Sequence, residues 1–259
     1  MKYYVVSDVH SFFDELKAAL TEKGFFEDAS PHKLIICGDM FDRGSQSKEM
    51  QDFIIDLLQK DEIILIRGNH EDLMLDLLQN AEFNFGRGID YTHHWSNGTV
   101  RTVTDLTRMD VFHDDYRDIV NKMSVTPYIK DIIPKTVDYY ETEHYIFVHG
   151  WIPCIKERGW WKGFFSPMEN WREANASMWN KARWYNGMYA HSLGVKEEGK
   201  TIICGHWHAA WGHLYLEHDD NEEINEEDIT DEPYYAEGII AIDACTARSG
   251  KVNCIVLED

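Results

Sequence analysis

The stretch KLIICGDMFDRG (residues 33–44) joins a short apolar run to a loop that carries two acids and an arginine. Residues 33–37 have the length and apolar character of a buried strand. Glycines flank the charged loop, and glycine allows tight turns and a close approach of the backbone to a ligand. A purely structural turn rarely needs so many charges. The stretch therefore predicts a strand that ends in Asp39, Asp42 and Arg43, side chains suited to a metal ion or a phosphate.

Four other apolar runs also end in side chains that can bind a metal ion or a phosphate. Residues 3–6 lead into Asp8 and His10, residues 63–66 into Asn69 and His70, residues 145–148 into His149, and residues 201–203 into His206 and His208. Ligands of open α/β sheets gather beyond the carboxyl ends of the strands. We therefore expect the five strand ends to deliver Asp, Asn and His to one edge, which is typical of a metal-dependent hydrolase.

Each of these motifs has a structural alternative when it is taken alone. Asp8 and His10 are equally consistent with a capping acid and a surface histidine. Asn69 can be a helix N-cap with Glu71 in the first turn, a role compatible with ligand binding. A histidine at a strand end, such as His149 or His206, is often only hydrogen-bonded. Only the occurrence of all five motifs in one chain is specific for a metal-dependent hydrolase.

Periodicity predicts a layered α/β fold, in which the first 80 residues follow a βαβαβα order. Strands are expected at 2–7, 33–37, 62–67, 144–149, 200–204, 238–243 and 251–257, and helices at 11–23, 46–60 and 71–80. We expect residues 1–259 to form a single domain with a mainly helical insertion at about 83–142. An aromatic-rich segment at about 151–190 is interpreted as packed structure, or alternatively as a substrate wall.

Composition restricts the classes of function. A chain of 259 residues can bury a substantial core. The net charge of −21 argues against nucleic acid and anionic membrane surfaces as partners, so an anionic substrate must be attracted locally by metal ions and arginines. The acidic residues 217–232 are expected to be a solvated loop, with a docking site for a basic partner as the alternative.

Cysteine usage and apolar runs predict a cytoplasmic protein. The five cysteines have no regular spacing and no Cys-x-x-Cys pair, as expected for buried thiols in a reducing compartment. No charged and apolar leader precedes the first strand, and no run approaches the roughly 20 apolar residues of a membrane span.

Together the motifs resemble the signature of the calcineurin-like metallophosphoesterases. They are Asp8-x-His10, GDMFDRG at 38–44, GNHE at 68–71, His149-Gly150 and Gly205-His206. The nearest branch is that of the phosphoprotein phosphatases, which includes serine/threonine phosphatases and bacterial symmetrical diadenosine tetraphosphate hydrolases. Residues 239–259 resemble the closing pair of strands of that branch. The chain departs from the pattern at Ser11, where glycine is usual, and at Trp151, where a small residue is usual.

The resemblance implies mixed central β-sheets flanked by helices and two metal ions that share Asp39. One ion would be bound by Asp8, His10 and Asp39, with His208 left open as a further ligand; the other by Asp39, Asn69, His149 and His206. A hydroxide bridging the two ions would attack phosphorus directly. Oxygen and imidazole ligands suit Mn, Fe or Zn better than Mg or Ca, and we favour Mn.

The resemblance also implies catalytic and phosphate-binding roles. His70 would be the general acid, Asp42 would orient it, and Arg43 and Asn69 would bind phosphate. Arg183 is the candidate second phosphate-binding arginine; the alternatives are Arg172 or a structural arginine.

The expected activity is that of a serine/threonine protein phosphatase, and the alternative is a symmetrical dinucleoside tetraphosphate hydrolase. Gly205-His206-Trp207 and a base-stacking role for the aromatic segment favour the alternative. A catalytically silent, metal-bound binding module is disfavoured because it would not need an acid and a phosphate clamp. The sequence contains no Cys-x5-Arg loop and no P-loop.

Overall fold

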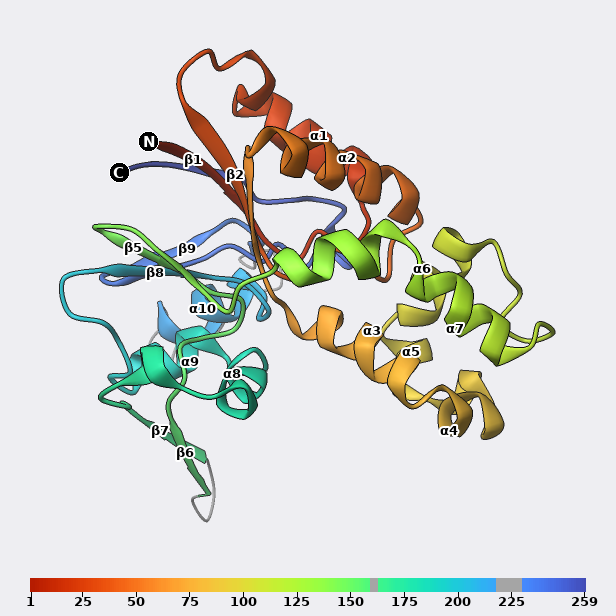
Figure 1. The fold of residues 1–259 in the computed structure, drawn as a ribbon. Coiled ribbons are helices and arrows are strands. Elements are labelled where there is room, and N and C mark those ends of the chain that lie inside the picture. Colours follow the sequence, from red (N-terminus) through yellow and green to blue (C-terminus); the bar gives the residue numbers. More distant parts are fainter. Residues whose placement is uncertain (159–162, 218–229) are drawn as a thin grey trace.

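Two mixed β-sheets form the centre of the protein (Figure 1). The computed structural model describes residues 1–158, 163–217 and 230–259. The first sheet has the strand order β11-β1-β2-β3, with β1 Lys2–Val6, β2 His32–Cys37, β3 Ile63–Ile66 and β11 Ile255–Glu258. The second has the order β4-β5-β8-β10-β9, with β4 Tyr140–Glu141, β5 Tyr145–Phe147, β8 Thr201–Cys204, β9 Tyr234–Ala236 and β10 Ile239–Ala241.

The strands that lead into the predicted motifs are parallel within each sheet. β1 pairs with β2, and β2 with β3, so that Val6 lies opposite Ile36 and Cys37 opposite Ile66. In the second sheet β8 pairs in parallel with both β5 and β10. The antiparallel strands β11, β4 and β9 occupy the outer positions. This arrangement brings the carboxyl ends of the parallel strands in each sheet to one edge.

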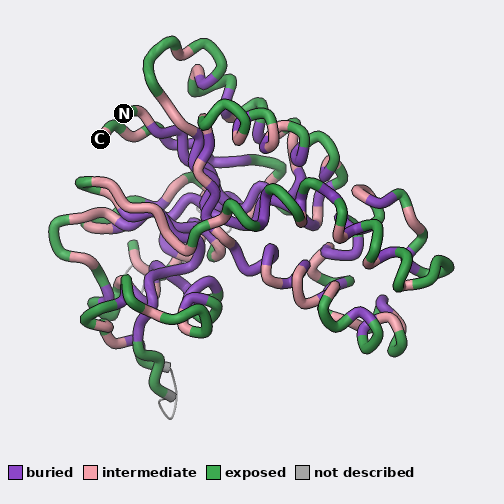
Figure 2. Tube along the Cα trace, viewed as in Figure 1, coloured by how far each residue is buried: buried purple, intermediate pink, exposed green. Residues whose placement is uncertain are grey.

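Alternation of side chains along the strands separates three hydrophobic layers. Tyr3 and Val5 of β1 pack between the sheets, in a cluster that also contains Phe147 and Ile203 of the second sheet. The other side of the first sheet packs against helices α1 (Phe13–Glu22) and α2 (Ser47–Lys60) and the insertion. The outer side of the second sheet packs against α8 (Ala176–Ala182), α9 (Gly187–Ser192) and α10 (Ala209–Leu216). Figure 2 shows the resulting buried centre, with exposure concentrated on the outer helices and loops.

Helices flank both sheets. Those next to the first sheet are α1 Phe13–Glu22, η1 Phe25–Glu27, α2 Ser47–Lys60 and α3 Asn69–Gln79. The insertion contains α4 Ala81–Gly86, η2 Ile89–Tyr91, α5 His93–Ser96, α6 Thr99–Thr107, α7 Tyr116–Ser124, η3 Tyr128–Ile132 and η4 Ile133–Lys135. The remaining helices are η5 Trp171–Glu173, α8 Ala176–Ala182, α9 Gly187–Ser192, α10 Ala209–Leu216 and α11 Thr246–Ser249. Helices α4 to α7 project from the sheets at the right of Figure 1.

The predicted α/β class, with mixed sheets flanked by helices, is confirmed. The sequence did not reveal β4, β9 or the hairpin of β6 Ile155–Arg158 and β7 Gly163–Ser166. The described residues of these strands are mostly exposed or half-buried, so the strands lack the continuous apolar run by which the buried ones were predicted. Trp160, Trp161 and residues 218–229 of the acidic segment lie outside the described residues. No helix in the described ranges has the length and apolarity needed to cross a membrane.

The aromatic segment is mainly packed structure. Trp151, Trp171 and Trp179 are buried in the cluster that covers the second sheet. Trp184 is different: it is about half exposed, and its ring centre lies 5.7 Å from that of His206. The segment therefore supplies core residues together with one ring next to the strand-end motifs.

Candidate active site

The loops that follow the parallel strands have an uncommon backbone conformation. Asp8, Asp39 and Asp42 have φ angles of 50°, 52° and 76°, in a region that costs a non-glycine residue roughly 1–2 kcal/mol. The buried carboxylate of Glu71, in the first turn of α3, offsets part of this cost. It accepts three backbone N–H bonds, including those of Asp39 (3.1 Å) and Gly68 (2.7 Å). Strain of this kind is concentrated at functional sites.

Asp39 lies at the centre of a cluster of imidazoles. Its Oδ2 is 3.8 Å from Nε2 of both His10 and His70, and its Oδ1 is 3.3 Å from Nε2 of His149. His206 forms a second group with Asp39 and His149, and the possible donor atoms of each group lie within 4.8 Å of one another. The structure thus brings together residues from the ends of β1, β2, β5 and β8.

The hydrogen bonds of the histidines show that this donor set fits metal ions. Nδ1 of His10 lies 2.9 Å from the carbonyl oxygen of Phe41, and Nδ1 of His149 lies 2.8 Å from that of Cys37. Because a neutral imidazole has one N–H, donation from Nδ1 leaves a lone pair on Nε2. Burial lowers the pKa of both histidines, which favours the neutral form. Nε2 of His149 faces the Asn69 side-chain oxygen at 2.8 Å, a pair of electron-rich atoms that a divalent cation would stabilise.

Asp8 and His208 lie at the same edge as these donors. The buried Asp8 accepts hydrogen bonds from the His206 backbone N–H (2.9 Å) and from the Ser7 hydroxyl. His208 is about half exposed, and its Nε2 is 4.0 Å from Oδ2 of Asp243. Neither Asp8 nor His208 belongs to the metal-binding groups found among the described residues, so their role as ligands stays a prediction.

His70 and Asp42 form a buried pair beside Asp39. Nδ1 of His70 lies 2.8 Å from Oδ2 of Asp42. The hydroxyls of Thr102 and Thr99, both in α6, donate to the Asp42 carboxylate at 2.6 and 2.9 Å. Burial raises the pKa of Asp42 to about 7, although both threonine hydrogen bonds act to lower it. The pair holds the His70 ring with Nε2 directed away from Asp42.

Arg43 lies on the open side of this pair. Its Nη2 is 3.2 Å from Nε2 of His70. Burial, and to a smaller extent the positive charge of Arg43, lower the His70 pKa well below its usual value. The Arg43 carbonyl accepts a hydrogen bond from Arg101 of α6 (3.2 Å). A phosphate bound by Arg43 would therefore lie directly beside His70.

The two candidates for a second phosphate-binding arginine are both paired with acids. Arg183 is buried and donates to Asp72 (2.7 Å) and to Asp138. The guanidinium of Arg172 makes two hydrogen bonds to Glu141, at 2.8 and 2.6 Å. The guanidinium of Arg183 is thus already bound by two carboxylates, which leaves its phosphate-binding role a prediction.

Three side chains around the site had not been selected from the sequence. Thr99 and Thr102 carry no local signal, because their contact with Asp42 depends on how the insertion packs. Asp243 is buried and follows the apolar strand β10, as Asp39 follows β2. The pattern of an apolar run that ends in a polar side chain, which identified Asp39, also applies to Asp243.

The buried histidines and the carboxylate gathered where the two mixed sheets meet form a candidate metal centre. The model of the calcineurin-like phosphoesterase family matches residues 1–223. The chain belongs to this family. Membership in this family of phosphoesterases implies divalent metal ions.

Individual relatives are more distant. A bis(5'-nucleosyl)-tetraphosphatase PrpE [asymmetrical] of Anoxybacillus flavithermus is 30% identical over 116 residues, which are 42% of this chain and 43% of that protein. A protein of the same name from Bacillus subtilis is 28% identical over 98 residues, 36% of this chain and 40% of the relative. The chain thus matches less than half the length of these curated relatives.

Among solved structures, a cold-active protein-tyrosine phosphatase of a psychrophilic Shewanella is similar in fold. It has a TM-score of 0.53 and 16% identity, and the match covers 100% of this chain and 75% of that one. At this identity the similarity supports the fold alone.

Proposed function

We propose that the protein hydrolyses phosphate esters or anhydrides with two divalent metal ions, Mn being favoured, and without a covalent phosphoenzyme. The proposed metal ligands are Asp8, His10, Asp39, Asn69, His149 and His206, with His208 as a possible further ligand. When bound, such ions supply a nucleophile at neutral pH and neutralise phosphate charge. The donor chemistry around Asp39 supports this assignment, because unprotonated imidazole nitrogens face carboxylate and amide oxygens there.

The observation that carries the proposal is the position of His70. Its Nδ1 is 2.8 Å from Asp42, and its Nε2 is 3.2 Å from Arg43. In the proposed mechanism Arg43 turns from Nε2 of His70 to the phosphate oxygens, which Asn69 also binds. Nε2 is then free to take up the proton released by the attacking water and to pass it to the leaving oxygen. Asp42 keeps the ring oriented and stabilises its charged form. Arg183 remains the proposed second phosphate contact.

We propose two substrate classes for a direct comparison. The motifs favour a phosphoserine or phosphothreonine protein. A dinucleoside tetraphosphate is favoured by the names of the curated relatives, which are described as asymmetrical hydrolases rather than symmetrical ones. Product analysis with Mn²⁺, offering a phosphothreonine peptide and diadenosine tetraphosphate side by side, separates the two. Phosphate from the peptide supports the first; ADP, or AMP with ATP, supports the second.

The mechanism is tested with His70→Asn. General acid catalysis typically contributes about 10²–10⁴-fold, so the variant should lose that factor on a phosphothreonine peptide, whose leaving alkoxide needs a proton. The loss on p-nitrophenyl phosphate should be far smaller. His144→Asn is the control, because His144 is exposed and is hydrogen-bonded to Asp259. Equal losses of the His70 variant on both substrates would refute the general-acid role.

A further inference from the structure

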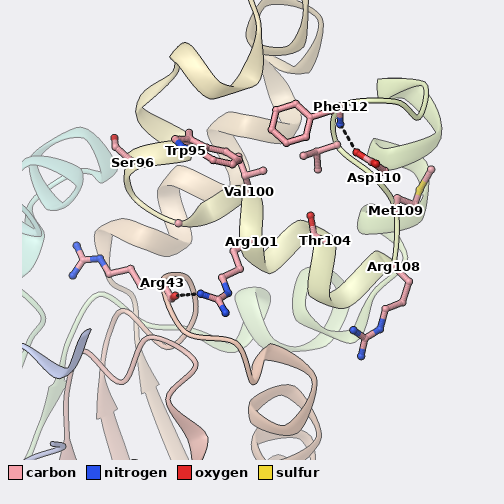
Figure 3. A pocket seen from close by; sticks show the side chains of 12 residues that line it. Arg43, Trp95, Ser96, Val100, Arg101, Thr104, Arg108, Met109, Asp110 and Phe112 are labelled. Carbon is pink, nitrogen blue, oxygen red and sulfur yellow. Dashed lines mark hydrogen bonds between the residues drawn. The ribbon is translucent and has the colours of Figure 1, made fainter. Parts of the chain in front are cut away.

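A large cavity lies between the loop after β2 (residues 38–44) and the helical insertion. Its volume is about 970 Å³, and its lining includes Arg43, Trp95, Arg101, Arg108 and Phe112 (Figure 3). Small-molecule sites usually measure about 300–1,000 Å³, so the cavity is large enough for a nucleotide. Its walls come from the loop after β2, from α5 and α6, and from the segment that follows α6.

One wall of the cavity is aromatic. The rings of Trp95 and Phe112 meet edge to face with their centres 5.5 Å apart. Both side chains remain about half exposed, at 48% and 54%, although they are large and apolar. Figure 3 shows them side by side above Val100. Exposed aromatic faces next to arginines are platforms on which nucleobases stack.

The cavity is also locally positive in a strongly acidic chain. Arg43, Arg101 and Arg108 belong to its lining, whereas the whole chain carries a net charge of −21. The lining also contains an acid, Asp110. Its carboxylate already accepts the backbone N–H of Phe112 (2.9 Å) and lies 2.8 Å from Nδ1 of His113. Asp105 of α6 interacts electrostatically with Arg101 and Arg108, so the three arginines face two nearby acids and still outnumber them.

Arg43 connects the cavity to the candidate active site. It lines the cavity, and its Nη2 is 3.2 Å from Nε2 of His70. Arg101 reaches across to the Arg43 carbonyl at 3.2 Å. A ligand with a planar aromatic group and a phosphate chain could thus stack its ring on Trp95 and bind its phosphates at Arg43.

We propose that this cavity is a nucleoside subsite and that the substrate is a nucleotide with a polyphosphate chain. The base stacks on Trp95 next to Phe112, and the phosphates extend past Arg101 to Arg43 and His70. This inference rests on the proposed function, since the phosphates that reach Arg43 are those the site would cleave. It assigns the specificity for the nucleoside to the insertion rather than to the tryptophan-rich segment 151–190.

The test measures binding rather than turnover. Calorimetric titration of the full-length, Mn²⁺-loaded protein compares α,β-methylene-ADP with methylenediphosphonate, two non-hydrolysable ligands that differ by an adenosine. Contacts of the phosphonates with the metal ions are common to both, so the difference in affinity reports the nucleoside. The nucleotide should bind at least tenfold more tightly, the order of one base–aromatic stack.

Trp95→Ala should remove most of this difference, and Trp95→Phe should restore part of it. Phe112→Leu provides a second, independent change in the same wall. Tyr91→Ala is the matched control, because Tyr91 is an 86% exposed aromatic residue of the insertion that does not line the cavity. This control should keep the affinity for both ligands.

Equal affinities for the two ligands, or a nucleotide affinity unaffected by Trp95→Ala and Phe112→Leu, would overturn the subsite. Loss of phosphothreonine-peptide binding in these variants, with nucleotide binding retained, would instead make the cavity a peptide groove. A protein that binds α,β-methylene-ADP through Trp95 but hydrolyses no phosphoester would retain the subsite and refute the proposed function. The two failures are therefore distinguishable.

Discussion

Replacing Thr102 with valine tests whether the insertion holds the Asp42–His70 pair in place. Valine keeps the shape of threonine but removes its hydroxyl. That hydroxyl donates to Asp42 Oδ1 at 2.6 Å and accepts the Asp42 backbone N–H at 3.0 Å. A hydrogen bond to a charged group is worth about 1.5–3 kcal/mol and a neutral one about 1 kcal/mol. Because both partners on Asp42 are buried, the variant should lose about 3 kcal/mol of stability, or roughly 100-fold in the folding equilibrium.

The free energy of unfolding is measured by urea denaturation at pH 7.5, followed by far-ultraviolet circular dichroism. Thr104→Val is the control, since Thr104 lies in the same helix but is exposed, and its cost should stay within about 0.5 kcal/mol. The Thr102 variant should also lose more activity on a phosphothreonine peptide than on p-nitrophenyl phosphate, because a less firmly held Asp42 orients His70 poorly. A stability loss no larger than that of the control would refute the claim that α6 supports this pair.

Three further predictions concern backbone space, pH and metal. At Gly98 (φ +81°) a Cβ atom would lie against the Arg43 backbone nitrogen and 2.8 Å from the Arg43 Cα, so Gly98→Ala should lower the free energy of unfolding by about 2 kcal/mol or more and should lower activity. The control is Gly194→Ala, since Gly194 has a similar φ of +87° but open space around it. In the same denaturation assay it should lower the free energy of unfolding by only about 1 kcal/mol. Hydrogen bonds from Arg172 lower the pKa of Glu141 to about 2, so this pair stabilises the fold above about pH 4.5 and loses that effect as the pH falls toward 2. Glu141→Gln should therefore lower the free energy of unfolding by about 1 kcal/mol at pH 7. A loss of stability that does not shrink between pH 5 and pH 3 would contradict this. Removal of metal with EDTA should abolish hydrolysis and lower the melting temperature, and Mn²⁺ should restore both; full activity in a protein shown to be metal-free would exclude metal-dependent chemistry.

Local pattern alone was enough to predict the strand ends. An apolar run followed by a polar side chain identifies the place of Asp39, Asn69 and His149, because a buried strand needs apolar residues and its end is where the chain meets solvent and ligand. Parallel pairing aligns the strand ends within each sheet, and the packing of the two sheets places Asp39 of the first against His149 of the second. The α/β class followed from periodicity in the same way.

The partners of these side chains were decided only by tertiary packing. Thr99 and Thr102 lie 57 and 60 residues from Asp42 in the chain, and they reach it because α6 packs beside the loop after β2. The sequence offers Arg183 as a phosphate-binding candidate, with a structural role as the alternative, and only the fold pairs it with Asp72 and Asp138, residues from distant parts of the chain. Hydrogen bonds act over about 3 Å and depend on direction, so sequence spacing predicts which groups the site contains, and only the packing of the insertion determines which groups hold them in place.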